Sequence, residues 1–313
     1  MLQHITISQF TTTSGKTFDI PLSYETFGPE LHSAPIVLVN HALTGNSSVS
    51  GENGWWKTLV GKEKVINTER FTVLCFNVPG NGYDGFLVEN FIDFTAKDIA
   101  RIFLKGLQQL NISKLHTIIG GSVGGSIGWE MLALEKNLAN QFIPIASDYK
   151  TTDWLYSQCL VQQFLLNSGQ DALQKSRIHA MLCYRTPQSI NERFQLERSE
   201  NSDLRKSHDW LNYHGNALNE RFSLKAYQLM NQLLMTINVS DDDLKSIDAE
   251  IHLIAVDSDL FFPAFEIRKC FGLLKKEKSN IFYHEINSVH GHDAFLMEYE
   301  QLNSILNLCL NEK

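Results

Sequence analysis

The sequence lacks the segments that mark membrane and exported proteins. No apolar run in its 313 residues is long enough to cross a bilayer. Its first ten residues, MLQHITISQF, lack a basic stretch followed by an apolar one, so we expect no secretory leader. These absences predict a soluble, cytoplasmic protein that does not act at a membrane.

Paired cysteines, excess basic charge and metal-ligand spacings are absent as well. The five cysteines stand apart without a Cys-x-x-Cys pair, which favours a reducing compartment over a disulfide framework. The formal net charge of -8 predicts a surface that repels phosphate backbones, so we exclude nucleic acid as a partner. The nine histidines other than His290 and His292 show no spacing typical of metal ligands, and we expect no metal site.

The sequence does contain an alternation of apolar strands and amphipathic helices. The expected strands cover residues 35–39, 71–76, 116–120, 142–146, 251–256 and 281–286. The expected helices cover residues 93–110, 126–134 and 295–310. Because strands and helices alternate, the crossovers predict an α/β protein with a mostly parallel sheet.

Strand signals disappear between about residues 149 and 239, where a mixed segment rich in Gln, Asn and Leu shows helical spacing. We interpret this segment as a helical lid inserted into the core. The predicted organisation is a first core part at 1–148, the lid at 149–240 and a second core part at 241–313.

A glycine-rich motif, Gly120-Gly121-Ser122-Val123-Gly124-Gly125, stands where an expected strand turns sharply into a helix. A G-x-S-x-G pattern in this context predicts an exposed nucleophile, here Ser122. The backbone N–H of Val123, at the start of the helix, would point at an oxyanion formed there. A glycine-rich turn with a capping serine, or a weak phosphate loop, is the alternative interpretation.

A serine nucleophile needs a base, and an aspartate and a histidine follow Ser122 in the chain order that this elbow requires. Asp259 lies just past the expected strand 251–256, and His292 lies past the next strand. Asp257 competes with the first and His290 with the second, and position alone leaves both pairs open.

The loop that follows the first expected strand offers a second oxyanion donor. It reads Asn40-His41-Ala42-Leu43-Thr44-Gly45, and we assign the backbone N–H of Leu43. An ordinary strand-ending turn is an equally good interpretation of this loop by itself.

Taken together, these motifs resemble the homoserine O-acetyltransferase family. The core motifs that carry the resemblance are His41-Ala42-Leu43-Thr44-Gly45, Gly54-Trp55-Trp56, Gly121-Ser122-Val123-Gly124-Gly125, Ser258-Asp259 and Gly291-His292-Asp293-Ala294-Phe295-Leu296. The lid motifs are Ser176-Arg177-Ile178, Met181-Leu182-Cys183-Tyr184-Arg185-Thr186, Tyr213-His214-Gly215 and Glu220-Arg221-Phe222. The resemblance spans roughly residues 35–299, nearly the whole chain.

The resemblance implies an α/β-hydrolase fold, with a mostly parallel central sheet flanked by helices and an inserted helical lid. It implies these roles: Asp259 and His292 as partners of Ser122, Leu43 and Val123 as oxyanion donors, Arg177 for the homoserine carboxylate, and Asp293 for its ammonium group. It further implies acetyl-CoA as a co-substrate without a bound cofactor, L-homoserine as the acceptor, a step in methionine biosynthesis, and a homodimer.

Three departures from the family pattern bear on specificity. The segment from Asn77 to Gly85 replaces a Gly-Cys-x-Gly-Ser-Thr-Gly-Pro loop, the lid segment after Asn167 is shorter, and Gln162 stands where Arg is common. These departures leave open acetyl or succinyl as the acyl group and homoserine or serine as the acceptor. A serine esterase with the same triad is the rival enzyme, and a noncatalytic binding protein would have a broken triad, whereas all three members are present.

Overall fold

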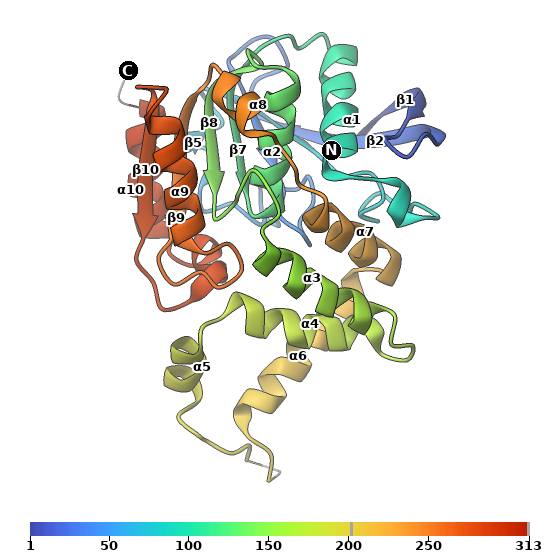
Figure 1. The fold of residues 1–313 in the computed structure, drawn as a ribbon, viewed down its shortest axis with the longest axis vertical. Coiled ribbons are helices and arrows are strands. Elements are labelled where there is room, and N and C mark those ends of the chain that lie inside the picture. Colours follow the sequence, from blue (N-terminus) through green and yellow to red (C-terminus); the bar gives the residue numbers. More distant parts are fainter. Residues whose placement is uncertain (201–202, 312–313) are drawn as a thin grey trace.

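The computed structural model describes residues 1–200 and 203–311. Its centre is an eight-stranded sheet in the order β1-β2-β6-β3-β7-β8-β9-β10 (Figure 1). The strands are β1 (Gln3–Thr11), β2 (Thr17–Phe27), β3 (Ile36–Asn40), β6 (Thr72–Phe76), β7 (Leu115–Gly121), β8 (Ala139–Ile145), β9 (Glu250–Val256) and β10 (Ile281–Ile286). The pairings from β6 through β10 are parallel, and the two antiparallel pairings are β1 with β2 and β2 with β6, so the predicted mostly parallel sheet is confirmed.

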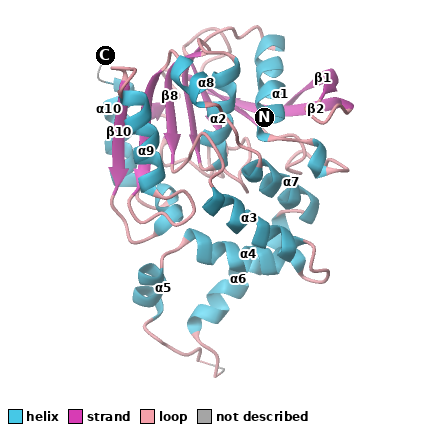
Figure 2. Ribbon diagram, in the orientation of Figure 1, coloured by secondary structure: helices cyan, strands magenta, loops and turns pink. Residues whose placement is uncertain are grey.

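Side chains alternate between the two faces of the sheet, and helices cover both faces (Figure 2). On one face the core includes α1 (Ala96–Gln109), α2 (Val123–Leu134) and α9 (Ala264–Lys275). On the other face it includes α10 (Tyr299–Asn311) and the segment that contains the short strands β4 (Val60–Gly61) and β5 (Ile66–Asn67). Every residue of β3 and β6 is buried, which accounts for their unbroken apolar sequence.

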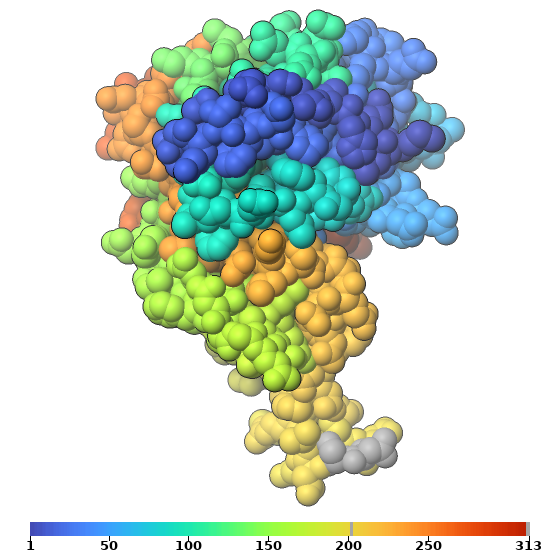
Figure 3. All heavy atoms as spheres, turned by 90° about the vertical axis from the view of Figure 1, so that its right-hand side faces the viewer, coloured from blue at the N-terminus to red at the C-terminus, as the bar shows by residue number. Residues whose placement is uncertain are grey.

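The segment between β8 and β9 is helical and lies beyond the carboxyl ends of the central strands (Figure 1). Its helices are α3 (Asp153–Leu166), α4 (Ala172–Tyr184), α5 (Pro187–Phe194), α6 (Lys206–Arg221), α7 (Leu224–Met235) and α8 (Asp241–Ser246). Its two ends meet, since the N–H of Val239 donates to the carbonyl of Tyr149 (3.0 Å) and that of Thr151 to the carbonyl of Ile237 (2.9 Å). Figure 3 shows the yellow part of the lid, around α5 and α6, as a narrow projection.

Three local features differ from the sequence-based expectation. The expected helix 295–310 is divided into a 3-10 turn, η2 (Gly291–Leu296), and α10, because the chain leaves helical geometry at Met297 (φ -129°, ψ -43°). The hairpin β1–β2 and helix α9 were not identified from the sequence. Within the described ranges, no helix combines the length and the apolar character that crossing a bilayer requires.

Candidate active site

Ser122 occupies a sharp turn between β7 and α2. Its φ of 56° and ψ of -132° are unfavourable for a residue with a Cβ. The turn also requires two glycines, because a side chain at either position would collide with the backbone. A Cβ on Gly124 would lie 2.3 Å from the carbonyl oxygen of Asn40, and one on Gly120 would lie 2.5 Å from the carbonyl carbon of Gly124. The motif therefore forms the strand-to-helix elbow that the sequence predicts.

His292 bridges Ser122 and Asp259. Its Nε2 lies 2.9 Å from Ser122 Oγ, and its Nδ1 lies 2.7 Å from Asp259 Oδ2. The other carboxylate oxygen of Asp259 accepts hydrogen bonds from the backbone N–H groups of Phe261 (2.7 Å) and Phe262 (2.9 Å). Because a carboxylate accepts, His292 carries its proton on Nδ1, and Nε2 is free to accept the hydroxyl proton of Ser122.

Four aromatic rings surround the imidazole of His292. The ring centroids of Tyr184, Phe261, Phe262 and Phe295 lie 5.2 to 5.6 Å from its own. Tyr184 comes from α4 of the lid and Phe295 from η2, so lid and core both contribute to this enclosure. His292 is only 4% exposed. Such an apolar surrounding lowers the local dielectric and keeps water away from the base.

The competing residues His290 and Asp257 point elsewhere. Nδ1 of His290 lies 2.9 Å from Ser189 Oγ and 3.1 Å from Nη2 of Arg185, both in the lid. The carboxylate of Asp257 accepts a hydrogen bond from the backbone N–H of Ser288 (3.0 Å). In the described chain neither side chain hydrogen-bonds to Ser122 or His292, so the contact geometry favours His292 and Asp259.

The loop after β3 packs against the first turn of α2. The side-chain amide of Asn40 donates to the carbonyl of Gly124 (3.2 Å), which holds the loop and the elbow together. Leu43 and Val123 are both buried. Within residues 1–200 and 203–311 their backbone N–H groups donate to no other group. Buried donors without a partner are costly, so these two N–H groups are candidates for binding an oxyanion.

His41 connects this loop to the segment 77–85, a contact that sequence reasoning missed. Its Nε2 accepts from the backbone N–H of Val78 (3.0 Å), so its Nδ1 carries the proton and donates to the carbonyl of Ala42 (2.8 Å). Burial lowers the pKa of His41 to about 4, and the ring is therefore neutral near pH 7. The motif containing His41 was noticed in the sequence, but its spacing gives no sign of the distant partner.

Asp293 lies beside the base and faces arginines of the lid. Its carboxylate is 3.8 Å from Nη1 of Arg185. Burial raises the pKa of Asp293, while Arg177, His292 and Arg185 act in the opposite direction. The guanidinium of Arg177 lies 5.8 Å from the ring centroid of Tyr184 and has no hydrogen-bond acceptor among the described residues. Its donors are therefore available to a ligand.

Two further arginines near the site were not assigned from the sequence. Arg185 is 7% exposed, and its Nε and Nη2 donate to Ser189 Oγ (3.1 and 2.7 Å). Arg221, at the end of α6, donates from Nη1 to the carbonyl of Thr44 (3.1 Å) in the loop after β3. Both lie in lid motifs quoted for the family resemblance, but only the tertiary structure reveals what they contact.

The departures from the family pattern lie at separate places in the structure. Asn77 is buried and donates to Ser47 Oγ (3.0 Å), so the segment 77–85 supports the loop after β3 from behind. Gln162 is buried inside the lid, where its Nε2 lies 2.8 Å from Nδ1 of His179. Neither side chain contacts Ser122 or His292 in the described structure.

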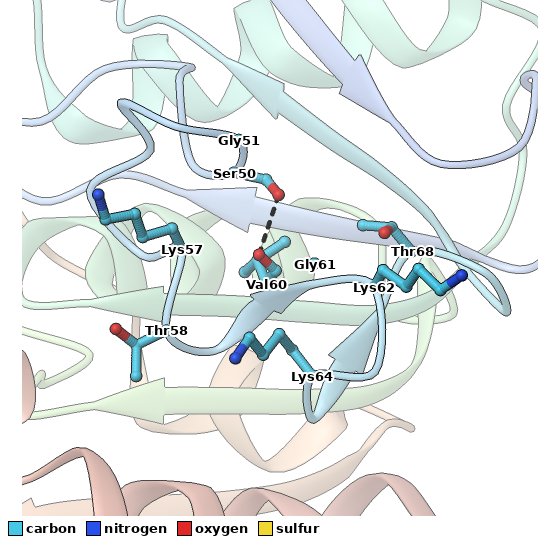
Figure 4. A pocket seen from close by; sticks show the side chains of 9 residues that line it. All are labelled: Ser50, Gly51, Lys57, Thr58, Val60, Gly61, Lys62, Lys64 and Thr68. Carbon is cyan, nitrogen blue, oxygen red and sulfur yellow. Dashed lines mark hydrogen bonds between the residues drawn. The ribbon is translucent and has the colours of Figure 1, made fainter.

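A separate cavity of about 500 Å³ lies beside the segment 50–68 and contains three lysines (Figure 4). Lys57 donates to the carbonyl of Glu52 (2.7 Å), and Lys62 pairs with Glu69 (3.1 Å). Of the described residues that line this cavity, none belongs to the site around Ser122. We assign it no part in the chemistry.

Comparison with known proteins identifies the fold and the family of the chain. Residues 35–290 match the model of the alpha/beta hydrolase fold family. The homoserine O-acetyltransferase of Cyclobacterium marinum is 30% identical, over 94% of this chain and 90% of the relative. That of Methanobrevibacter ruminantium is 28% identical, over 96% of this chain and 71% of the relative.

Solved structures agree on the fold. The homoserine O-acetyltransferase from Bacillus anthracis superposes with a TM-score of 0.88 at 18% identity, over 100% of this chain and 98% of that one. Esterase E22 superposes with a TM-score of 0.87 at 17% identity, over 99% and 100%. At such identities the structures report on the fold alone. Together with the sequence matches over almost the whole chain, they confirm the resemblance seen in the motifs: the chain belongs to the homoserine O-acetyltransferase family of the α/β-hydrolase fold.

Proposed function

We propose that this acyltransferase moves an acetyl group from acetyl-CoA to the side-chain hydroxyl of L-homoserine through an acyl-Ser122 intermediate. The observation that carries the proposal is the hydrogen-bonded series Ser122–His292–Asp259, with contacts of 2.9 and 2.7 Å, in a chain of the homoserine O-acetyltransferase family. This arrangement supports a nucleophile, a general base and a group that orients the base.

In the first half-reaction, His292 Nε2 takes the proton of Ser122 as Oγ attacks the thioester carbonyl carbon of acetyl-CoA. The negative charge on the carbonyl oxygen is stabilised by the N–H groups of Leu43 and Val123. The carbon–sulfur bond then breaks, and CoA leaves as a thiol after taking the proton from His292. Asp259 stabilises the imidazolium that exists between these two proton transfers.

In the second half-reaction, the homoserine hydroxyl gives its proton to Nε2 of His292 and attacks the acyl carbon. The same two N–H groups hold the oxyanion, and the Ser122 Oγ–carbon bond breaks. Ser122 recovers the proton from His292, and O-acetylhomoserine leaves. The sequence of steps is symmetrical, so one base serves both halves.

The acceptor carries a carboxylate and an ammonium group near pH 7. We assign the carboxylate to Arg177, whose planar guanidinium can donate two parallel hydrogen bonds to it. We assign the ammonium to Asp293, which follows His292 directly. Because burial favours the neutral carboxyl, Arg185 at 3.8 Å supports the ionised form of Asp293 that this role requires.

The same triad in an esterase would pass the acyl group to water. The aromatic enclosure of His292 and the open donors of Arg177 favour an amino-acid acceptor over water. The altered segment 77–85 supports the loop that carries Leu43 through the hydrogen bond from Val78 to His41.

The test is product analysis by mass spectrometry. Purified protein is incubated with acetyl-CoA or succinyl-CoA, each with L-homoserine or L-serine or with no acceptor. We expect O-acetylhomoserine to form fastest and little free acetate to form without an acceptor. Acetate release at the same rate with and without homoserine would instead identify a hydrolase, and a dominant succinyl or seryl product would correct the substrates.

A further inference from the structure

Three side chains with metal-binding atoms meet at the edge of the sheet, away from Ser122. His252 lies in β9 and His284 in the neighbouring edge strand β10, and Cys309 lies in the last turns of α10 (Figure 1). His252 lies two residues before Ile254, whose side chain belongs to the core on the α10 face. Strand alternation therefore places its imidazole on the same face as Cys309.

The distances fit one metal ion. Nδ1 of His252 lies 3.2 Å from Nε2 of His284, and one ring nitrogen of each histidine and Cys309 Sγ all lie within 4.8 Å of one another. In a tetrahedral zinc site, Zn–N bonds of about 2.05 Å separate two nitrogen ligands by about 3.3 Å. The histidine pair already has this spacing. His252 and Cys309 are buried, and His284 is half-buried, so an ion there would be shielded but reachable.

A carboxylate orients the first histidine. Nε2 of His252 lies 3.0 Å from Glu250 Oε1, and the same oxygen accepts a hydrogen bond from Gln141 Nε2 (2.9 Å). Gln141 also donates to the backbone carbonyl of Cys309 (2.8 Å), which ties the end of α10 to the strands. With its Nε2 proton held by Glu250, His252 presents the lone pair of Nδ1 toward His284. A carboxylate behind a ligating imidazole is typical of zinc sites.

We propose that His252, His284 and Cys309 bind one Zn²⁺ ion, with water as the fourth ligand. Two imidazoles and a thiolate form a donor set that suits Zn²⁺. In the metal-free protein, His284 Nε2–H donates to His252 Nδ1. On binding, that proton moves to Nδ1 of His284, and the thiol of Cys309 loses its proton to solvent, so each ion bound releases one proton.

The proposed metal site has a structural role rather than a catalytic one. His252 lies near the amino end of β9, whereas Asp259 lies beyond the carboxyl end of that strand. A bound ion would join the edge strand β10 to the final helix, which packs on this face through apolar side chains such as Leu302 and Leu306. Because the ion binds only the folded chain tightly, it raises thermal stability. This inference concerns binding and stability, and it does not depend on the acyl-transfer proposal.

The experiment uses the metal-free full-length chain with Zn²⁺, and with Co²⁺ as a spectroscopic substitute. We expect one Zn²⁺ per chain, a higher melting temperature with Zn²⁺, and a thiolate-to-cobalt charge-transfer band with Co²⁺. Cys309→Ser should remove the band, and both Cys309→Ser and His284→Gln should weaken Zn²⁺ binding by about tenfold or more. Circular dichroism checks that each variant is folded.

Cys183→Ser is the matched control. Cys183 Sγ also lies beside a histidine nitrogen, 3.7 Å from Nδ1 of His179, but in the lid. This variant should keep the cobalt band and the zinc-induced rise in melting temperature. Binding that is lost in Cys183→Ser, unchanged in both Cys309→Ser and His284→Gln, or absent from the wild type would overturn the proposal.

Discussion

At Ser122 a single backbone conformation explains both the strain and the chemistry. A residue with a Cβ at φ 56° costs on the order of 1–3 kcal/mol, and the packing of β7 and α2 maintains it. Because alanine also carries a Cβ, replacing the serine leaves that cost unchanged. The elbow should therefore fold in the same way with or without the hydroxyl.

From this follows the first prediction, that Ser122→Ala abolishes CoA release while its unfolding curve matches the wild type. Incubating the wild type with acetyl-CoA alone should add one acetyl group to the peptide that contains Ser122. Thiol detection of CoA and peptide mass spectrometry measure the two effects. Near-normal turnover in the variant, or acetylation of another peptide, would refute the elbow as the nucleophile.

A second prediction separates the paired candidates. His292→Ala and Asp259→Asn should lower kcat/KM by about 10³-fold or more, because each breaks the hydrogen-bonded series that reaches Ser122. In His290→Ala and Asp257→Asn, kcat/KM should fall by less than about tenfold, because these side chains contact Ser189 and Ser288 instead. Steady-state kinetics of the four variants decides the matter, and a reversed order within either pair would contradict the assignment.

The third prediction concerns His41 and acid stability. Its folded pKa of about 4 lies below the ordinary value of 6.5, so the unfolded chain binds a proton more readily between these values. The contribution of His41 to the free energy of unfolding is therefore complete above pH 6.5 and is lost as the pH falls toward 4. Between pH 7 and pH 4.5 the free energy of unfolding should fall in both proteins. We expect the fall to be about 2–3 kcal/mol smaller in His41→Asn than in the wild type.

Denaturant titrations at both pH values measure this difference. Asp148 acts in the opposite direction, because burial raises its pKa to about 6 and its contribution is lost as the pH rises. That contribution is common to wild type and variant and cancels in the comparison. Parallel curves for the wild type and His41→Asn would show that His41 is not a buried neutral group.

Residue types and chain order were enough to name the candidate site residues, but not to show which side chains face one another. The sequence placed Ser122, Asp259 and His292 in the order the elbow requires. Position along the chain left His290 and His292 both open, because the turn between them decides which ring faces the serine, and only the family resemblance implied His292. The sequence also could not assign Arg185, whose partner Asp293 lies on a distant segment of the chain. Such contacts depend on how the lid docks on the core.

Elements buried on both faces were the most predictable part of the fold. Each residue of β3 and β6 is buried, so their apolar runs stand out in the sequence. The edge strand β1 is mostly exposed and polar, and an irregularity between Ile7 and Phe10 interrupts its alternation, so its own pattern is weak. Helix α9 does bury Ala264, Ile267, Cys270 and Leu274 at helical spacing, so its pattern was present in the sequence but was not identified.

Two helical glycines provide a fourth prediction. A Cβ on Gly124 in α2 would lie 2.3 Å from the carbonyl oxygen of Asn40 and 2.7 Å from that of His41, and both are backbone atoms. We expect Gly124→Ala to lower the free energy of unfolding by about 1–3 kcal/mol and to impair activity, because the loop that carries Leu43 must move. Chemical denaturation and CoA release measure the two effects.

Gly272, in α9, provides the matched control. A Cβ there would meet nothing within 4 Å, so Gly272→Ala should gain up to about 1 kcal/mol from helix propensity alone. If Gly124→Ala were as stable and active as Gly272→Ala, the close packing of loop and elbow would be wrong.

At the scale of the whole molecule, a cluster of arginines in the lid contrasts with the negative net charge of the chain. The chain carries a formal net charge of -8. In the lid, burial first and then Arg177, Arg185 and Arg193 lower the pKa of His214 to about 4. These arginines create a locally positive region on an acidic protein. Such a region attracts anionic ligands, which fits both the phosphates of the proposed donor, acetyl-CoA, and the carboxylate of the proposed acceptor.

The last prediction separates a transferase from a hydrolase through Arg177, which the lid contributes, and Ser122, which the core contributes. If Arg177 binds the homoserine carboxylate, Arg177→Ala weakens acceptor binding by about 2–4 kcal/mol and spares the first half-reaction. The variant should still acetylate Ser122 in a single turnover yet transfer poorly to homoserine. Arg177→Lys should restore transfer only in part, because an ammonium group cannot reproduce the planar pair of hydrogen bonds.

Burst amplitude, compared with homoserine-dependent turnover, separates these two half-reactions. Lys175, an exposed cation on the same helix, bonds only to the carbonyl of Gln170 among the described residues, so Lys175→Ala should behave as the wild type in both. If Arg177→Ala kept the wild-type dependence on homoserine, Arg177 would not bind the acceptor. A reduced burst in Arg177→Ala would place the arginine in the first half-reaction instead, as a ligand of CoA, because acylation of Ser122 requires no amino-acid carboxylate.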